Sequence, residues 1–399
     1  MVEIRSIAAD EAEAFRSCVM TTFGGGTEED PRNGDWLRAL LAPGRAWAAF
    51  EGGSVVATAG TFGLTVGVPG GSMPMAGLTM VSVRPTHRRR GLLRELMRLH
   101  IEDARQHGEA INALWASEAT IYGRFGFGIA VESDALTIDT RGLGVASIGE
   151  PDPCVWIEQA EALERLPAIY ARAMAGRPGA LYRDVTWWRE RRFLELPSQR
   201  AGASMRRYVV VRRGDEDVGY IVYRQRPEFR DALPTGATEI IEVIAVDPRA
   251  EASLWQFVAG IDLFPIAKWS NAPSDSVLPW IALDSNRVSR RRISTLWLRI
   301  DEVAAALASR RYAVDGALRF SVGGATWSLV VEAGQGRCTP TDAAPEIDFA
   351  GTTLGSVFLG SVAVATLARA GRITGSDEAV ARANRLFAWP LAAWCPEIF

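Results

Sequence analysis

The residues with the clearest chemical potential lie where a predicted strand meets a predicted helix, in the run VSVRPTHRRRGLLREL at 81–96. The first backbone N–H groups of a helix have no intrahelical acceptor, and the helix dipole adds partial positive charge there. Gly91 allows an anion to approach the backbone, and the flanking arginines add charge-assisted hydrogen bonds. The junction predicts a site for the diphosphate of a nucleotide. A solvated basic helix start beside an ordinary glycine is the alternative.

A second chemical motif, YGRFGF at 122–127, follows further along the chain. A phenol has a pKa of about 10, close enough to the pKa of about 8.5 of a thiol for Tyr122 to share its proton with a leaving thiolate. Tyr122 is therefore a candidate general acid. The alternative is an aromatic side chain that only packs in a short helix.

Together the two motifs resemble the acyl-CoA pyrophosphate loop and the Y-x-x-x-G-F ending of the GNAT acetyltransferase superfamily, although Leu93 stands where the superfamily prefers a small residue. RPTHRRRGLLRELM with SEATIYGRFGFG resembles, more narrowly, the enhanced intracellular survival family of bacterial N-acetyltransferases. The resemblance covers essentially the whole chain. It implies an acetyl-CoA-dependent N-acetyltransferase with a mixed α/β (α+β) fold: an active N-terminal GNAT domain, a degenerate second GNAT domain and a sterol-carrier-protein-like C-terminal domain.

The same resemblance implies which residues contact acetyl-CoA. The strand holding Val81, Ser82 and Val83 would lie beside pantetheine. In the superfamily a bulge splays this strand and frees backbone N–H groups for the thioester carbonyl. The arginine–glycine loop would hold the phosphates, and two residues would lie further along the cofactor. The loop residues are Arg89, Arg90, Gly91, Leu92, Leu93 and Arg94, and the two further residues are Ser117 and Glu118.

The general base is less obvious among the side chains. In the resembled family the chain's own C-terminal carboxylate enters the active site as the base, and here that group belongs to Phe399. The tail at 394–399 is short and apolar, and Pro396 stiffens it, which suits a docked terminus. Burial would raise the pKa of this carboxylate from about 3.5. A tail that only packs is the alternative, with Glu118 or Glu397 as the rival base.

The acceptor side is predicted from resemblance alone. Phe23 and Trp36 flank the first loop region and would line an amine pocket, with Glu28 and Glu29 nearby. Local core packing of the two aromatic side chains is the alternative. The family's acceptors include aminoglycosides, polyamines and protein lysines, so the expected partner is a cationic small-molecule amine or a lysine. The family also assembles as hexamers, and we expect a homo-oligomer of six copies.

Hydrophobic periodicity predicts the elements that position these residues. A strand, a helix over 8–23 and a hairpin turning at Gly52 and Gly53 precede the strand that ends at Pro85. A helix opens at Gly91 and ends at Gly108, with its apolar residues on one face. A strand at 110–116 leads to the tyrosine motif, and AVESDALTIDT is expected to close the domain as its last strand.

A weaker repeat of this order follows. The run VRP at 83–85 aligns with VDP at 246–248, and the preceding hairpins align at nearly the same offset, which favours domain duplication over chance similarity. The second copy has DPRAEA at 247–252 in place of the arginines and glycine, so it is not expected to hold CoA. The predicted domains are 1–145, 146–288 and 289–399, with the last sending its tail to the active site.

The C-terminal third supports a competing hypothesis. The apolar run at 352–371 predicts one helix, which either packs a core and an oligomer surface or lines a lipid tunnel. A non-enzymatic lipid or small-molecule carrier, or an assembly scaffold, would use this domain. The carrier does not explain the arginine–glycine loop, and a scaffold would show no CoA binding, so the N-acetyltransferase is the leading hypothesis.

The amino-acid composition argues against several other classes of protein. The 399 residues, 48% hydrophobic and 23% charged, suit two or three globular domains. A net charge of −3 argues against a general nucleic-acid binder and fits a cationic substrate. Four cysteines without a CxxC pair, and three histidines placed elsewhere, support neither a metal site nor a disulfide framework. The acidic N-terminus and the absence of a long apolar stretch predict no signal peptide and no membrane helix, hence a cytoplasmic location.

Overall fold

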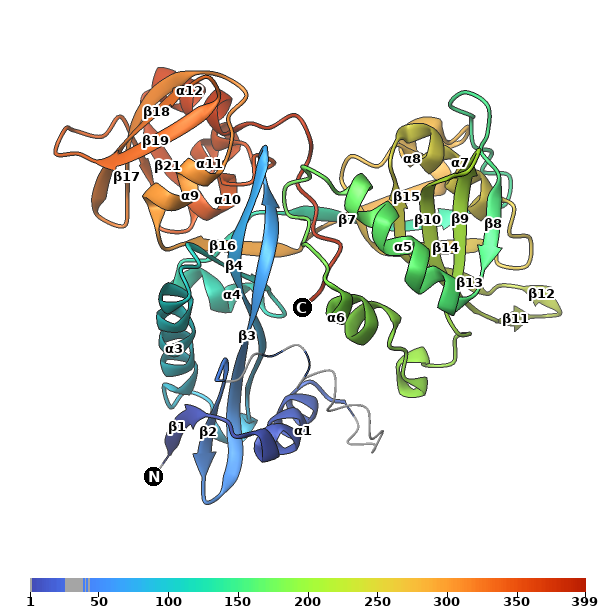
Figure 1. Cartoon of the computed structure of the whole chain (residues 1–399), viewed down its shortest axis with the longest axis horizontal. Helices are drawn as coiled ribbons and strands as arrows, with labels where there is room; N and C mark the ends of the chain where they lie inside the picture. The colour runs from blue at the N-terminus through green and yellow to red at the C-terminus, as the bar shows by residue number, and fades with distance from the viewer. Residues whose placement is uncertain (1, 26–38, 40, 42–43) are drawn as a thin grey trace. The chain divides into compact units, whose positions relative to one another are not determined.

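The computed structural model describes residues 2–25, 39, 41 and 44–399 (Figure 1). The chain divides into two compact units. The first unit comprises Met1–Val131, Gly176–Tyr182 and Ser294–Phe399, and the second comprises Glu132–Ala175 and Arg183–Ile293. None of the helices in the described part of the chain has the length and apolar character needed to cross a membrane.

The first unit is built on a seven-stranded sheet with the strand order β1-β2-β3-β4-β5-β16-β6. The predicted hairpin turn is confirmed, because Gly52 and Gly53 both have positive φ between β2 and β3. The strands are β1 Glu3–Ser6, β2 Ala46–Glu51, β3 Ser54–Val68, β4 Gly71–Val83, β5 Ile111–Trp115, β6 Gly128–Ile129 and β16 Leu296–Ile300.

Helices cover both faces of this sheet. Successive side chains of a strand point to opposite faces, so each strand contributes apolar residues to the core on either side. Trp47 and Ala49 join the core under α3 (Leu92–Gln106), whereas Ala46 and Ala48 join the core that contains Phe15 of α1 (Ala12–Thr22). The predicted helix opening at Gly91 is confirmed, and Figure 1 shows α3 beside the β3–β4 hairpin. Short helical turns complete this part: η1 Ala9–Glu11, η3 Pro85–His87, α4 Ala119–Tyr122 and η4 Gly123–Phe125.

The C-terminal part of the first unit has its own five-stranded sheet, in the order β19-β18-β17-β20-β21. The single helix predicted for 352–371 is wrong, because the chain turns at Gly360, which has φ of 86° and lies against Trp389. Its two halves are α10 Thr353–Val357 and α11 Val364–Arg369. The other elements are α9 Val303–Ser309, β17 Gly316–Val322, β18 Ala325–Glu332, β19 Gln335–Pro340, β20 Ile347–Phe349, β21 Ile373–Gly375 and α12 Asp377–Phe387.

The second unit has a seven-stranded sheet in the order β15-β7-β14-β13-β10-β9-β8. Its strands are β7 Glu132–Asp139, β8 Cys154–Ile157, β9 Arg207–Arg213, β10 Glu216–Arg226, β13 Ala237–Ala245, β14 Ile266–Pro273 and β15 Val288–Ser294, with a ribbon of β11 Phe229–Arg230 and β12 Leu233–Pro234. Its helices are α5 Gln159–Ala173, α6 Val185–Trp187, η5 Trp188–Phe193, η6 Pro197–Arg200, α7 Pro248–Ala259, α8 Leu278–Ile281 and η7 Ser285–Arg287.

Two strands join sheets that their positions in the chain do not predict. AVESDALTIDT contains β7, which pairs with β14 in the second sheet instead of closing the first. The strand β16 lies within the predicted third domain, 289–399, but pairs with β5 and β6 in the first sheet. Alternating apolar and polar residues show which side chains of a strand face the core, but they do not show which sheet the strand joins. The domain limits 1–145, 146–288 and 289–399 stay a prediction.

Candidate active site

The site begins where two parallel strands separate. The strands β4 and β5 pair at Ala76 with Asn112 and at Gly77 with Ala113. Both strands continue past this point, β4 to Val83 and β5 to Trp115. Because no further register pairs join them, the space between their carboxyl-terminal ends opens into a cavity.

A bulge in β4 lies at the mouth of this opening. The register between β3 and β4 shifts between Thr58 and Gly60, which leaves Met80 and Val81 without a partner in β3. Met80 has φ of 52°, and the Thr58 hydroxyl donates to its carbonyl oxygen at 2.7 Å. The Oγ of Ser82 lies 2.6 Å from the same hydroxyl, so the Ser82 side chain is buried and only its backbone is available. The bulge expected from the superfamily is therefore present.

An inner cavity of about 280 Å³ occupies the opening. Its walls come from β4, from β5 with the residues after it, from α4 and from the end of the chain. It brings together Tyr122, Val81 and Ser117 from the predicted set with Phe399. Phe23 also lines it, and the side chain of Phe23 is 58% exposed.

A larger groove of about 1070 Å³ is lined by the loop before α3. Gly91 has φ of 83° and is the N-cap residue of α3, and a Cβ atom added there would meet nothing within 4 Å. Within the described residues, the guanidinium groups of Arg88, Arg89 and Arg94 line the groove and have no carboxylate partner. An open helix N-terminus beside uncompensated cations is a site for an anion.

The structure divides the predicted loop residues into two groups. Arg90 donates to Glu51 at 2.7 Å and does not line the groove. His87 contacts the same carboxylate at 2.7 Å, and these two partners lower the pKa of Glu51 to about 2. Arg90 thus ties the loop to β2. The predicted residues that do line the groove are Val81, Ser82, Val83, Arg89, Gly91, Leu92, Leu93, Arg94, Ser117 and Glu118.

Tyr122 lies where the cavity and the groove meet, because it lines both. The residue is 5% exposed, and its ring packs edge-on against Phe127 at 6.3 Å between centroids. Burial raises the pKa of Tyr122, the charge of Glu118 raises it further, and a hydrogen bond with Ser117 opposes both. The phenol therefore stays protonated at neutral pH, as a proton donor must.

The turn that carries Tyr122 is held by a residue far along the chain. Arg299 of β16 donates to the carbonyl oxygen of Phe125 and also donates to the carboxylate of Asp301. Gly126 has φ of 87°, and a Cβ atom there would lie 3.1 Å from the Arg299 guanidinium. No local pattern in the sequence pointed to Arg299.

The end of the chain enters the inner cavity, and in Figure 1 the red tail leads from α12 to the C-terminus near the β3–β4 hairpin. Phe399 is buried, and its ring lies over Gly77, where an added Cβ atom would approach it to 3.1 Å. Gly77 therefore makes room for the terminus at the point where β4 and β5 part. Glu397, the rival base, is buried but lines neither cavity, whereas Glu118 lines the groove. Trp36, Glu28 and Glu29 lie outside the described residues.

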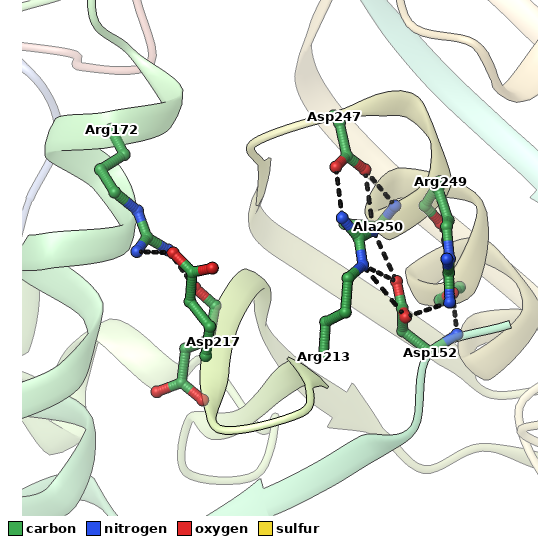
Figure 2. A network of polar contacts seen from close by, with 9 residues as sticks. Asp152, Arg172, Arg213, Asp217, Asp247, Arg249 and Ala250 are labelled. Atoms are coloured by element: carbon green, nitrogen blue, oxygen red, sulfur yellow. Dashed lines mark hydrogen bonds and ion pairs between the residues drawn. The ribbon is translucent and has the colours of Figure 1, made fainter.

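The second unit has no equivalent loop. Its β13 and α7 are joined directly through residues 246 and 247, whereas residues 84–91 separate β4 from α3. Figure 2 shows carboxylates at the start of α7. Asp247 accepts from Ala250 N at 2.9 Å, and Arg213 donates to both Asp247 and Asp152 at 2.7 Å. Arg249 donates to Asp152 at 2.7 Å. Asp247 thus caps this helix start, and Asp152 pairs with Arg249 in its first turn.

Comparison with known families agrees with this geometry. Residues 3–130 match the model of an acetyltransferase (GNAT) domain, and residues 179–300 match a second such model. Residues 303–396 match a sterol carrier protein domain. The three models follow the predicted order of an N-terminal GNAT domain, a second GNAT domain and a sterol-carrier-like domain.

Relatives that match most or all of the chain identify the family within the GNAT N-acetyltransferases. An uncharacterized N-acetyltransferase of Streptomyces avermitilis is 33% identical over 408 residues, covering 100% of this chain and 99% of that protein. The N-acetyltransferase Eis of Mycobacterium tuberculosis H37Ra is 36% identical over 354 residues, covering 84% and 83%. The crystal structure of Eis1 from Mycobacterium abscessus, at 27% identity, superposes with a TM-score of 0.83 and full coverage of both chains. A GCN5-related N-acetyltransferase of Anabaena variabilis shares the fold, with a TM-score of 0.86 at 17% identity and full coverage of both chains. The chain therefore belongs to the Eis (enhanced intracellular survival) family of GNAT N-acetyltransferases.

Proposed function

We propose that this N-acetyltransferase transfers the acetyl group of acetyl-CoA to a primary amine of a cationic acceptor by direct attack on the thioester. The acceptor classes that we propose are an aminoglycoside, a polyamine or a lysine. One observation carries the proposal: the buried hydroxyl-bearing Tyr122 and the terminal residue Phe399 line the same cavity, at the point where β4 and β5 part. GNAT acetyltransferases use acetyl-CoA as their co-substrate.

The groove suits the diphosphate of CoA. Gly91 leaves the start of α3 open, and Arg88, Arg89 and Arg94 supply positive charge that no described carboxylate neutralises. The bulge at Met80 and Val81 leads from this groove into the inner cavity. Backbone N–H groups that lack a strand partner at a bulge are suited to stabilise the oxygen of a reacting thioester carbonyl.

The chemistry needs one proton acceptor and one proton donor. The amine nitrogen attacks the thioester carbonyl carbon, so that a C–N bond forms and the C–S bond breaks. The terminal carboxylate of Phe399 accepts the proton that the amine loses, and Tyr122 donates its proton to the departing thiolate. The same carboxylate attracts a cationic acceptor into the cavity.

An acceptor screen with free thiol release as the readout tests the function. An aminoglycoside, spermidine and a lysine-containing peptide are each incubated with acetyl-CoA and the purified full chain. Release of thiol that depends on the acceptor supports the proposal, and the acetylated product identifies the nitrogen used. Failure of all three classes, with CoA still bound, would contradict the acceptor assignment.

A C-terminal extension tests the base separately. A short segment that a site-specific protease removes cleanly is appended after Phe399. We expect the extended chain to bind CoA but to lose turnover, and cleavage that restores Phe399 as the terminus to restore turnover. Full activity of the extended chain would transfer the role of base to Glu118 or Glu397.

Two further expectations accompany the proposal: a hexameric assembly and a cytoplasmic location. Native mass spectrometry of the purified chain measures the number of copies and detects any co-purified lipid or CoA. Fractionation of cells that produce the protein tests its location. Each of these results is independent of the acceptor screen.

A further inference from the structure

The segment Gly176–Tyr182, which we call the strap, is built into the first unit although the residues before and after it belong to the second. Its backbone runs beside the end of β3 and forms hydrogen bonds with it. Gly67 N donates to Ala180 O at 2.7 Å, Gly179 N donates to Gly67 O at 2.8 Å, and Tyr182 N donates to Thr65 O at 2.9 Å. Ala180 and Leu181 are buried. The strap is therefore an ordered part of the unit that carries the active site.

The strap also holds the C-terminal tail. Trp394 N donates to Pro178 O at 2.8 Å, and the Arg177 guanidinium lies 5.6 Å from the centroid of the Trp394 ring. Gly179 has φ of 85°, and a Cβ atom added there would lie 3.1 to 3.3 Å from the backbone O, C and N atoms of Trp394. Contact this close between two backbones requires glycine.

Between Trp394 and the terminus the chain has little freedom. Cys395 is fully buried, and its Sγ atom donates to the carbonyl oxygen of Glu397 at 3.3 Å. The ring of Phe399 then lies over Gly77. On the other side of Trp394, the Ser361 hydroxyl oxygen accepts from Ala393 N. The position of the last residue is thus determined by one anchor at Trp394 and one at Gly77.

We propose that the strap is a positioning element that sets the terminal carboxylate of Phe399 in place for catalysis, with Gly179 as its critical residue. The catalytic part of this inference rests on the function proposed above. The docking of the tail on the strap rests only on the contacts just described. Because a displacement of about 1 Å can lower a rate by two orders of magnitude, a small shift at Trp394 is enough to impair turnover.

A matched pair of glycine substitutions tests the strap. Gly176 lies in the same segment with φ of 72°, but a Cβ atom there would meet nothing within 4 Å. Gly176→Ala and Gly179→Ala therefore impose similar backbone strain, whereas only Gly179→Ala pushes against Trp394. In the full-length protein we measure kcat, the Kd for CoA, the melting temperature and the rate at which carboxypeptidase releases Phe399.

We expect Gly179→Ala to lower kcat by roughly tenfold or more, to leave the Kd for CoA within about twofold and to accelerate the release of Phe399. Gly176→Ala should match the wild type in kcat and in release. If Gly179→Ala impairs folding, Ser361→Ala removes the neighbouring anchor at Ala393 and should give a smaller effect of the same kind.

The measurements distinguish a failure of the strap as a positioning element from a failure of the terminal carboxylate as the base. Unchanged release of Phe399 in Gly179→Ala, or equal effects of the two glycine substitutions, would overturn the strap as a positioning element even if the extension experiment supports the terminal base. Faster release with an unchanged kcat would instead overturn the catalytic role of the carboxylate, and with it the base assigned in the proposed function.

Discussion

Tyr122 combines burial with access to both cavities. Its side chain is held by packing against Phe127, and Arg299 fixes the carbonyl oxygen of Phe125 within the same turn. Burial and the nearby charge of Glu118 raise the pKa of Tyr122 above its ordinary value, so the hydroxyl stays protonated throughout the neutral range, as the proposed role of proton donor requires. Loss of activity through deprotonation of Tyr122 is therefore expected only at strongly alkaline pH.

The first prediction concerns this hydroxyl. Tyr122→Phe should lower kcat by about two orders of magnitude, the usual contribution of a general acid, while leaving the Kd for acetyl-CoA nearly unchanged. Tyr312→Phe is the matched control, because it removes another buried hydroxyl, one that donates to Leu307 O outside both cavities. Steady-state kinetics and calorimetry on both variants give the comparison. A fully active Tyr122→Phe enzyme would remove Tyr122 from the mechanism.

The sequence predicted the residues of the site that belong to short local motifs. Gly91, Arg89 and Tyr122 follow from the loop and the tyrosine motif, and the structure places them around one groove. It could not show that Arg88 faces the groove while Arg90 pairs with Glu51, because this depends on the turn at Arg89, where φ is 64°. Gly77 escaped notice because its role depends on Phe399, at the far end of the chain.

At the scale of elements, the start of α3 carries the second prediction. Gly91 and Gly108 lie just outside opposite ends of this helix, both with positive φ and with free space around an added Cβ atom. Replacing either by alanine should destabilise the fold by about 1 kcal/mol. Only Gly91→Ala should also weaken CoA binding, by about tenfold, because its methyl group lies where a diphosphate would approach the backbone. Equal CoA affinity in the two variants, measured by titration calorimetry, would remove the loop from the binding site.

The start of α7 in the second unit carries the third prediction. Asp152 is buried and accepts from Arg213 and Arg249, so Asp152→Asn leaves two guanidinium groups without their shared partner. Because both arginine side chains are partly exposed, we expect a loss of about 1 to 2 kcal/mol in the free energy of unfolding. Urea unfolding measures it, with the exposed Asp215→Asn as the control.

CoA binding by the wild type and by Asp152→Asn tests whether the second GNAT domain has lost its CoA site. The wild type and Asp152→Asn should both bind one CoA per chain in calorimetry, because residues 246 and 247 provide no phosphate loop even when a carboxylate is removed. A second CoA bound in the variant would show that Asp152 blocks a competent site.

For elements in general, the sequence predicted boundaries well where a glycine marks one, as at the start of α3 at Gly91 and at the β2–β3 turn. It failed at 352–371, because an apolar run has no marker for the close approach of Gly360 to Trp389. The pairing of β7 and β16 also depends on residues distant in the chain, which alternation cannot specify.

At the scale of the whole molecule, we predict that stability in acid depends on a histidine that has no part in the proposed mechanism. His100 of α3 is fully buried, and its Nδ1 atom lies 2.7 Å from the Thr61 hydroxyl. Burial, helped by the charges of Arg45 and Arg299, lowers the pKa of His100 to about 3. Arg45 cannot move away easily, because it is buried and bonded to Asp103 and Glu109. The folded protein therefore holds His100 neutral where the unfolded chain would protonate it.

The sign of the pH dependence follows from this difference. The unfolded chain binds a proton at His100 below a pH of about 6.5, whereas the folded protein does so only near pH 3. The free energy of unfolding therefore falls as the pH drops between these values, by up to about 1.4 kcal/mol per pH unit. We expect the free energy of unfolding in urea to decrease between pH 7.5 and pH 5, and His100→Gln to reduce that decrease by about 2 kcal/mol. The wild type, measured in the same way, provides the reference slope. The comparison uses slopes against pH, since His100→Gln also changes the packing around Thr61. Equal slopes in the wild type and in His100→Gln would mean that other groups cause the acid sensitivity of this unit.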